Sequence, residues 1–372
     1  MLHVHHVNLQ PIVGGGEVYT RALTMALLEA GARVTLYVHP SVALWKGLAA
    51  PGLSIIECAA ERDLLARLPG RALVLTQCPL SRECIAELAA RHVLAGFAHM
   101  PMVQRSAEGF RPFALVFTVS QYCVDLLRGA GLAQVHPEPM YGTADLARAS
   151  APVRRRDLYL VDPQKPRDIL LGRWQSLTAS WRGQPYVARP GLTLGIVSLI
   201  APIKQFPALF SLLAPRMAQH PGVHLEVFGA GGYAQVRELR RALAPLHGRV
   251  RFWGYQPDVA AVYPLLDYLM TGLPEKEALG LNAIEAQFCG TPVLAPDAPP
   301  FTETVEDQAG GFRYRDPRED GGRHFDEVLA AIIAGRPRPD PRVAAADSLR
   351  RFTHEALVER ARHMLGALAA LG

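Results

Sequence analysis

The chain has 372 residues, more than one hydrophobic core usually organises, so its length predicts two or three domains. Hydrophobic residues make up 49% and charged residues 20%, a globular rather than a disordered composition. The net charge is +5, and there is neither a secretory leader nor an apolar run of about 18 residues, so no membrane-spanning helix is expected. The five cysteines include no Cys-x-x-Cys pair, which favours reduced thiols and a cytoplasmic location over disulfides or a zinc ribbon.

Basic residues cluster at Arg154–Arg156 and again over 336–342. One interpretation is a pair of solvated loops. The other is attraction to phosphate, from a charged acceptor, a nucleotide or a peripheral contact with the inner face of a membrane. No nucleic-acid partner is expected, because no interleaved aromatic and basic residues accompany these clusters.

The first part of the chain alternates short apolar runs with helical patterns, which predicts a parallel sheet flanked by helices. The expected strands are Leu2–Asn8, Val34–Val38, Ala72–Thr76, Val93–Phe97 and Leu115–Val119. A helix over Glu17–Ala30 has apolar residues at helical spacing and ends before Gly31. Ser120 is expected to cap a further helix that runs to about Arg128.

A second series of strands and helices follows an irregular stretch over Ala147–Pro190, which is rich in Arg, Pro and Asp. Its expected strands are Leu192–Leu199, His224–Phe228, Val250–Trp253, Tyr268–Thr271 and Val293–Ala295. Its expected helices are Phe206–Gln219, Gln235–Leu246, Ala260–Leu266 and Leu281–Cys289. A last amphipathic helix is expected over Thr353–Leu371.

These series predict an α/β fold of two Rossmann-like, doubly wound domains that face each other across a cleft. The first domain is expected over residues 1–190, including the insertion at 147–190, and the second over 191–352. Residues 353–372 are expected to return to the first domain. Ligands of such sheets bind at the carboxyl ends of the strands, so the loops after strands are expected to form the active site.

The strongest functional pattern is Glu277-Ala-Leu-Gly-Leu-Asn-Ala-Ile-Glu285, which runs into Gly290-Thr-Pro-Val293. Gly280 permits close backbone approach, and a helix is expected to begin near Leu281. The free N–H groups at a helix N-terminus suit a diphosphate, and ionised carboxylates accept hydrogen bonds from sugar or ribose hydroxyls. The alternative is a capped surface helix with acidic residues near its start.

This run resembles the donor signature of the family 4 retaining glycosyltransferases, which have the GT-B fold. The resemblance implies that Glu277 binds the transferred sugar and that Glu285 binds the ribose. It implies donor contacts from the segment between them at Ala278, Leu279, Gly280 and Leu281. Thr302, Glu303 and the later Gly310-Gly311-Phe312 continue the pattern.

Other segments resemble the same family. Gly14-Gly15-Gly16 resembles the glycine loop that approaches the donor, so Gly15 and Gly16 are candidate donor-binding residues. His99 resembles the active-site histidine, with a structural histidine as the alternative. Gly229-Ala-Gly231 resembles the turn near the base, and Tyr255 and Gln256 lie where the family contacts the base.

The chain also departs from the family pattern at two positions. Tyr141 stands where Pro-Asn-Gly is usual. The first strand of the second domain usually ends in Gly-Arg-Leu-x-x-x-Lys; here Lys204 matches the lysine, but Leu199 takes the arginine position. Arg173 and Arg189 are candidate substitutes for the missing cation.

The resemblance implies transfer of a sugar from a nucleotide-diphosphate sugar, UDP preferred over GDP, to a saccharide, lipid-linked or small-molecule acceptor. Retention of anomeric configuration is implied, with His99, Lys204 and Glu277 as catalytic residues. No Asp-x-Asp occurs, so neither a metal nor another cofactor is expected. A sugar-nucleotide epimerase, a phosphorylase of the same fold and an inactive sugar-nucleotide-binding subunit remain as alternatives.

Overall fold

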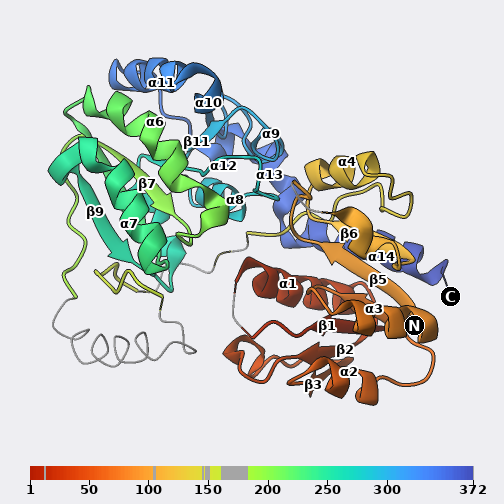
Figure 1. Ribbon diagram of the computed structural model, residues 1–372. Helices are drawn as coiled ribbons and strands as arrows, with labels where there is room; N and C mark the ends of the chain where they lie inside the picture. Colours follow the sequence, from red (N-terminus) through yellow and green to blue (C-terminus); the bar gives the residue numbers. More distant parts are fainter. Residues whose placement is uncertain (12–13, 104–105, 145, 147–150, 161–182, 372) are drawn as a thin grey trace. The chain divides into compact units, whose positions relative to one another are not determined.

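The chain forms two compact units, one of Met1–Asp145 with Arg350–Gly372 and the other of Leu146–Leu349. The computed structural model describes residues 1–11, 14–103, 106–144, 146, 151–160 and 183–371 (Figure 1). The segment that includes the last helix therefore belongs to the same unit as the first strand.

The first unit contains a six-stranded parallel sheet in the order β3-β2-β1-β4-β5-β6. Its strands are β1 (His3–Asn8), β2 (Arg33–Val38), β3 (Leu53–Glu57), β4 (Leu73–Thr76), β5 (Val93–Ala98) and β6 (Leu115–Thr118). Its α-helices are α1 (Gly15–Glu29), α2 (Glu61–Arg67), α3 (Arg82–Arg91), α4 (Gln121–Gly129) and α14 (His354–Ala369). The strand order reverses between β1 and β4, as in doubly wound nucleotide-binding folds.

The second unit repeats this order as β12-β11-β10-β7-β8-β9, again with parallel pairing throughout. Its strands are β7 (Leu192–Val197), β8 (Val223–Phe228), β9 (Val250–Gly254), β10 (Tyr268–Met270), β11 (Val293–Pro296) and β12 (Gly311–Tyr314). Its helices are α6 (Phe206–Ala218), α7 (Tyr233–Ala242), α8 (Leu281–Phe288), α9 (Phe301–Thr304), α10 (Pro317–Asp320), α11 (Arg323–Ile333), α12 (Pro341–Ala344) and α13 (Ala346–Leu349). Here the order reverses between β7 and β10.

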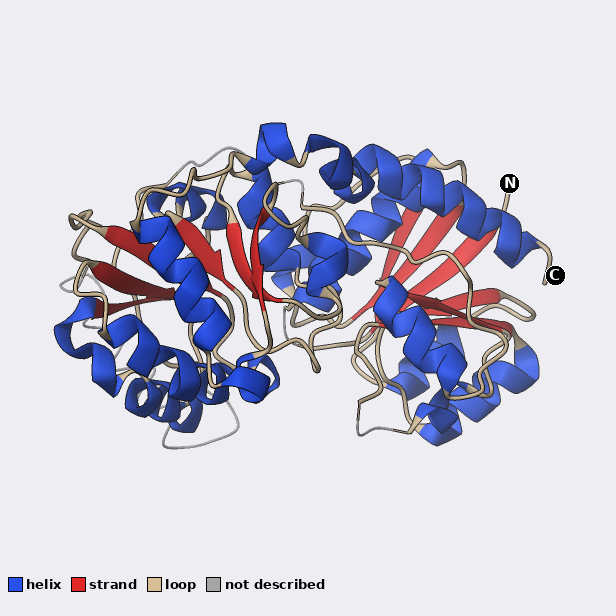
Figure 2. Cartoon of the chain, turned by 90° about the horizontal axis from the view of Figure 1, so that it is seen from above, coloured by secondary structure: helices blue, strands red, loops and turns tan. Residues whose placement is uncertain are grey.

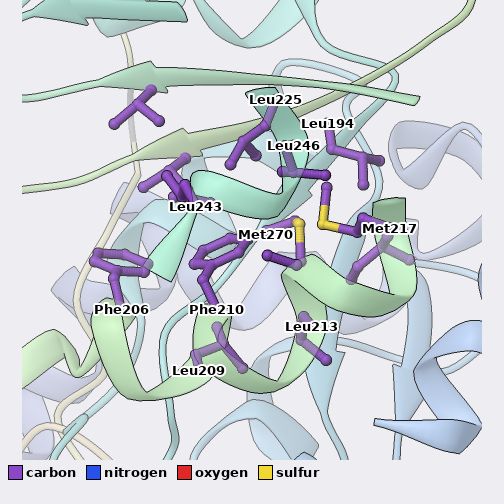
Figure 3. Packing of buried hydrophobic residues seen from close by; sticks show 14 of the residues in the cluster. Leu194, Phe206, Leu209, Phe210, Leu213, Met217, Leu225, Leu243, Leu246 and Met270 are labelled. Carbon is purple, nitrogen blue, oxygen red and sulfur yellow. The ribbon is translucent and has the colours of Figure 1, made fainter. Parts of the chain in front are cut away.

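Helices lie on both faces of each sheet (Figure 2), which explains why central strands such as β1 and β7 are buried along nearly their whole length. In the second unit, α6 presents an apolar stripe at helical spacing to the sheet. Figure 3 shows this packing, in which Phe206, Phe210 and Met217 of α6 meet Leu225 of β8 and Met270 of β10. Among the described helices, none combines the length and apolarity needed to cross a membrane.

The two sheets confirm the α/β class and the Rossmann-like halves, and each has one edge strand that was not expected from the sequence. These strands are β3 and β12. Two expected helices are also shorter than expected because prolines interrupt them. Pro245 falls within the 3-10 turn that follows α7, and Pro264 lies in the second of two 3-10 turns that replace the expected Ala260–Leu266 helix.

The described part of the 147–190 stretch packs with the second unit, which corrects its expected place in the first domain. Its apolar side chains provide the physical reason. Val153 is buried beside Trp253, and Leu158 is buried in the core that includes α6. The main chain of Tyr159 also forms a parallel bridge with Gly231.

Tyr141, the departure from Pro-Asn-Gly, holds the C-terminal segment on the first unit. Its ring meets Phe352 edge-on at 5.3 Å, and the Arg360 guanidinium lies over it at 4.9 Å. Burial lowers the pKa of Arg360, and the neighbouring Glu138 carboxylate opposes that shift. A half-buried cation is thus stabilised by the face of the tyrosine ring.

We expect Tyr141→Asn, which introduces the family's usual residue, to destabilise the first unit by about 1–3 kcal/mol through loss of the aromatic and cation–π contacts. Tyr141→Phe keeps the ring and should lose less. Thermal unfolding and amide hydrogen exchange of α14 measure the effect. Unchanged exchange of α14 in the Asn variant would contradict this role.

Candidate functional site

Two charged side chains meet at the point where the second sheet reverses. The strands β7 and β10 are neighbours, and both end at the same edge because they are parallel. Lys204 follows β7, and Glu277 follows β10. The Lys204 ammonium donates to Oε2 of Glu277, although the two residues are 73 positions apart. Their side chains are 25% and 14% exposed, so the pair is largely shielded from water.

The two segments that carry this pair are joined along their backbones. Gly272 lies so close to Lys204 that a Cβ there would approach the Lys204 carbonyl oxygen to 2.3 Å. One residue further, the Gln205 side-chain amide donates to Oε1 of Glu275 at 2.8 Å. Arg318 donates to the other oxygen of Glu275 at 2.8 Å, and together these bonds hold the pKa of Glu275 below its usual value.

Glu277 also organises the turn into α8. Its Oε1 accepts the main-chain N–H groups of Ala278 and Gly280, each at 3.2 Å. Gly280 has a φ of 78°, a left-handed conformation that suits glycine, and α8 begins at Leu281 as the sequence predicts. Among the described residues, no side chain caps α8, and the N–H groups of an uncapped first turn suit an anionic ligand. Ala278 and Leu279, the other two candidate donor-binding residues of this turn, are buried.

Glu285 lies one turn into α8 and is nearly enclosed. The Tyr263 hydroxyl donates to its Oε2 at 2.6 Å. Burial raises the pKa of Glu285, whereas the hydrogen bond from Tyr263 and the charge of Lys204 partly offset this rise. The sequence-predicted residues Lys204, Glu277, Gly280, Leu281 and Glu285 therefore lie around one helix N-terminus.

The glycine turn Gly229-Ala-Gly231 has a structural reason. A Cβ at Gly229 would lie 1.8 Å from the Ser198 carbonyl oxygen, and one at Gly231 would lie 2.3 Å from that of Ile200. The Ile200 N–H donates to the Ala230 carbonyl at 2.9 Å. The glycines thus allow the segment that leads to Lys204 to cross the end of β8.

The residues expected at the base contact the chain's own segment Arg154–Leu160. The Tyr255 N–H donates to the Asp157 carbonyl at 3.4 Å, and the Gln256 side-chain amide donates to the Arg154 carbonyl at 2.8 Å. Gln256 is buried, whereas the Tyr255 side chain is 60% exposed. The exposed ring borders a cavity of about 960 Å³ whose described lining includes Arg154, Arg155, Arg156, Arg240 and Phe252.

Leu199, at the arginine position of the family pattern, is 51% exposed. Arg189 does not lie beside it. The Arg189 guanidinium donates to Glu226 at 3.0 Å and to the carbonyls of Gly248 and Arg249. Gly248 and Arg249 precede β9 and so lie at the amino ends of the strands, whereas Leu199 follows the carboxyl end of β7. Arg173, the other candidate substitute, lies outside the described residues.

His99 of the first unit follows β5, beside the end of β4. Its Nε2 lies 2.5 Å from Oε1 of Gln77, the first residue after β4. This geometry makes Nε2 the protonated nitrogen and leaves Nδ1 as the acceptor. The ring stacks on Phe97 at 5.4 Å and meets Tyr19 edge-on at 5.2 Å. Burial lowers the pKa of His99 to about 4, so the imidazole is neutral at pH 7.

Gly15 and Gly16 begin α1 of the first unit. The Gly14 N–H donates to Oε2 of Glu17 at 2.7 Å, so this carboxylate closes the turn from within. A Cβ at Gly16 would meet no atom of the described residues within 4 Å. In each unit, predicted residues thus lie at the start of a helix that follows a strand: Gly15 and Gly16 at α1, and Gly280 and Leu281 at α8.

One comparison with known proteins concerns the second unit. Residues 192–330, most of the second unit, match the model of the family described as Glycosyl transferases group 1. This part of the chain therefore resembles a group 1 glycosyltransferase domain. A relative from Segniliparus rotundus, a D-inositol 3-phosphate glycosyltransferase, is 28% identical over 335 residues, which cover 80% of this chain and 72% of the relative.

Two solved structures share the fold over the whole chain. Anabaena HepE, in complex with UDP and glucose, is 18% identical with a TM-score of 0.70, covering 99% of this chain and 100% of HepE. Sucrose-phosphate synthase from Thermosynechococcus elongatus is 17% identical with a TM-score of 0.70, covering all of both chains. These likenesses show that the chain has the GT-B fold.

Two residues that contact the predicted ones, one in each unit, carried no signal strong enough to select them. Gln77 follows a strand as His99 does, so its position at a strand end was the available clue. Tyr263 lies in a segment that reads as an ordinary helix, and its partner Glu285 is 22 residues later. Within the described ranges, no cluster of three or more His, Cys, Asp and Glu side chains is arranged to hold a metal ion.

We expect the His99 imidazole to show no titration between pH 5.5 and 8, because burial lowers its pKa to about 4 from the ordinary 6.5. The lowered pKa of His99 also sets the direction in which the stability of the fold changes with pH. Protonation favours the unfolded chain, so the contribution is complete above about pH 6.5 and decreases as pH falls toward 4. Proton NMR of the imidazole, assigned with His99→Gln, makes the measurement.

The exposed His363 provides the internal control, since its hydrogen bond to Glu138 raises its pKa above 6.5. It should titrate in the same spectra. A midpoint near 6.5 for His99 would show that its ring is hydrated rather than enclosed.

Proposed function

We propose that this protein transfers a sugar from a UDP-sugar to an acceptor hydroxyl, with retention of anomeric configuration and without a divalent metal. The observation that carries the proposal is the Lys204–Glu277 pair at the uncapped start of α8, with Glu285 enclosed one turn later. This arrangement provides a cation and main-chain donors for a diphosphate, and separate carboxylates for a sugar and a ribose.

The donor part of the proposal assigns a role to each group. The β-phosphate would sit at the N–H groups of Leu281 and Asn282, with Lys204 turning from Glu277 to the phosphate. Glu277 would then accept hydroxyl hydrogen bonds from the sugar, and Glu285 those of the ribose. The complex of HepE with UDP and glucose supports UDP as the first nucleotide to test.

The chemical step follows from where the charges lie. The bond from the anomeric carbon to the phosphate oxygen breaks, and Lys204 and the helix N-terminus stabilise the departing diphosphate. The acceptor oxygen bonds to the same face of that carbon, and its proton passes to the leaving phosphate. Glu277 is not assigned as a nucleophile, because its Oε1 accepts the main-chain N–H groups of the turn at Ala278 and Gly280 and its other oxygen is assigned to the sugar hydroxyls.

The acceptor part rests on the first unit and on the relatives. A neutral His99 with Nδ1 as acceptor suits a hydrogen bond from a sugar hydroxyl. The acceptor classes remain a saccharide, a lipid-linked saccharide or a small molecule. The D-inositol 3-phosphate glycosyltransferase of Segniliparus rotundus makes inositol 3-phosphate the first small-molecule acceptor to test.

The direct experiment incubates the protein with UDP-glucose or UDP-N-acetylglucosamine and an acceptor panel, in excess chelator. We expect UDP release that depends on the acceptor and an α-linked product from the α-configured donor, read by proton NMR. Activity restored only by magnesium or manganese would contradict metal independence, and a β-linked product would contradict retention.

The same experiment separates the competing functions. An epimerase would convert the donor sugar without an acceptor and release no UDP. A phosphorylase would need inorganic phosphate in place of an acceptor hydroxyl. A binding subunit would take up UDP, as measured by calorimetry, and turn over no donor with any acceptor.

We expect Lys204→Ala to lower turnover by roughly 10²–10³-fold, the usual cost of removing one charge-stabilising group from an active site. Lys276→Ala, a nearby lysine change, is the matched control and should retain turnover. Thermal unfolding of each variant checks that the unpaired Glu277 has not disrupted the fold. Near-normal turnover of Lys204→Ala would transfer the role to another cation, with Arg318 the first to examine.

A further inference from the structure

Tyr263 is the buried partner of the proposed ribose-binding carboxylate. It begins the 3-10 turn Tyr263–Leu265, and its side chain is fully enclosed in the second unit. Its hydroxyl donates to Oε2 of Glu285 at 2.6 Å. A phenol that is buried against a carboxylate fixes the plane of that carboxylate, because its O–H has one acceptor to satisfy.

Thr291 holds Tyr263 in place from the other side. The Thr291 hydroxyl, fully buried, donates to the Tyr263 carbonyl oxygen at 2.7 Å. Thr291 lies just after α8, which carries Glu285, and just before β11. Hydrogen bonds therefore link the turn after α8 to Tyr263 and Tyr263 back to α8.

We propose that Tyr263 is a positioning residue for nucleotide binding, whose hydroxyl holds Glu285 in the orientation that accepts the ribose hydroxyls. This inference rests on the proposed function, because it assigns the ribose to Glu285. With Oε2 bonded to the phenol, Oε1 of Glu285 is the oxygen directed at the ligand. Tyr263 itself does not touch the nucleotide.

The charges around Glu285 give this role a signature in pH. Burial raises the pKa of Glu285, and the Tyr263 hydrogen bond acts against that rise. Lys204 also lowers this pKa, and the Cys289 thiol faces Glu285 from one turn further along α8. Burial raises the pKa of Tyr263 well above its usual value, so its hydroxyl remains a donor at every pH tested. Without that donor, Glu285 should become protonated at a higher pH.

The test is Tyr263→Phe, with calorimetric titration of UDP, and of GDP, at pH 5.5, 6.5 and 8. We expect roughly tenfold weaker UDP binding at pH 6.5, the usual scale for loss of a hydrogen bond to a charged group, and partial recovery at pH 8. Tyr314→Phe is the matched control, since that buried hydroxyl has no partner among the described residues and should bind UDP as wild type does.

Two further variants keep the inference falsifiable. Glu285→Gln cannot ionise at this position, so it should bind UDP weakly and lack the pH dependence that protonation of Glu285 gives the wild type. Thr291→Val removes the hydrogen bond to the Tyr263 carbonyl but leaves the Tyr263 hydroxyl in place. This variant should therefore shift the pH dependence of UDP binding in the same direction as Tyr263→Phe, by a smaller amount. Carbon NMR of the Glu285 side chain, without nucleotide, reports directly whether Tyr263→Phe raises its pKa.

The outcomes separate this inference from the proposed function. If the wild-type protein binds neither UDP nor GDP, the proposed donor and the inference both fail. If wild type binds and Tyr263→Phe binds equally well at each pH, the inference alone fails. A loss by the same factor at every pH, with an unchanged Glu285 pKa, would also overturn it, because that is the result of a general packing defect.

Discussion

The pairing of Lys204 with Glu277 depends on one property of a parallel sheet: neighbouring strands end at the same edge. Because β7 and β10 pair across the point where the strand order reverses, the loops after them are brought together although their residues are far apart in sequence. A cation and a carboxylate that are both largely shielded from water stabilise each other there. The close backbone approach at Gly272, the turn that Glu277 bonds and the start of α8 all depend on the position of this pair.

Most of each sheet could be predicted from the sequence, because strands covered by helices on both faces are apolar runs between turn signals. The edge strands could not. Leu53–Glu57 contains Ser54 and Glu57 and is only partly buried, whereas β1 and β8 are buried along most of their length. Gly311–Tyr314 is four residues long and begins with a glycine that lies against the main chain of Val293. At an edge, pairing with one neighbour defines the strand, and composition gives little indication of it.

In the second unit, the sequence indicated the charged residues of the candidate site better than it indicated the structural role of the glycines. Lys204, Glu277 and Glu285 could be selected because they match the donor signature of the glycosyltransferase family that the sequence resembles. The glycines at 229 and 231 were expected near the base, yet their lack of side chains accommodates the main chain of Ser198 and Ile200. Contacts between segments of irregular structure, such as Arg154 with Gln256, have no period in the sequence and so could not be predicted. The role of each site residue in binding remains a prediction.

The membership of Arg350–Gly372 in the first unit also has a consequence for biosynthesis. During translation, residues 1–145 emerge from the ribosome long before α14, the helix that packs against α1, has been synthesised. Until then, the apolar face that α14 covers with Leu357, Ala361 and Met364 has no partner from its own chain. The second unit is continuous over Leu146–Leu349 and emerges complete before that helix. Vectorial synthesis therefore favours completion of the second unit first, while the first unit waits for its last helix.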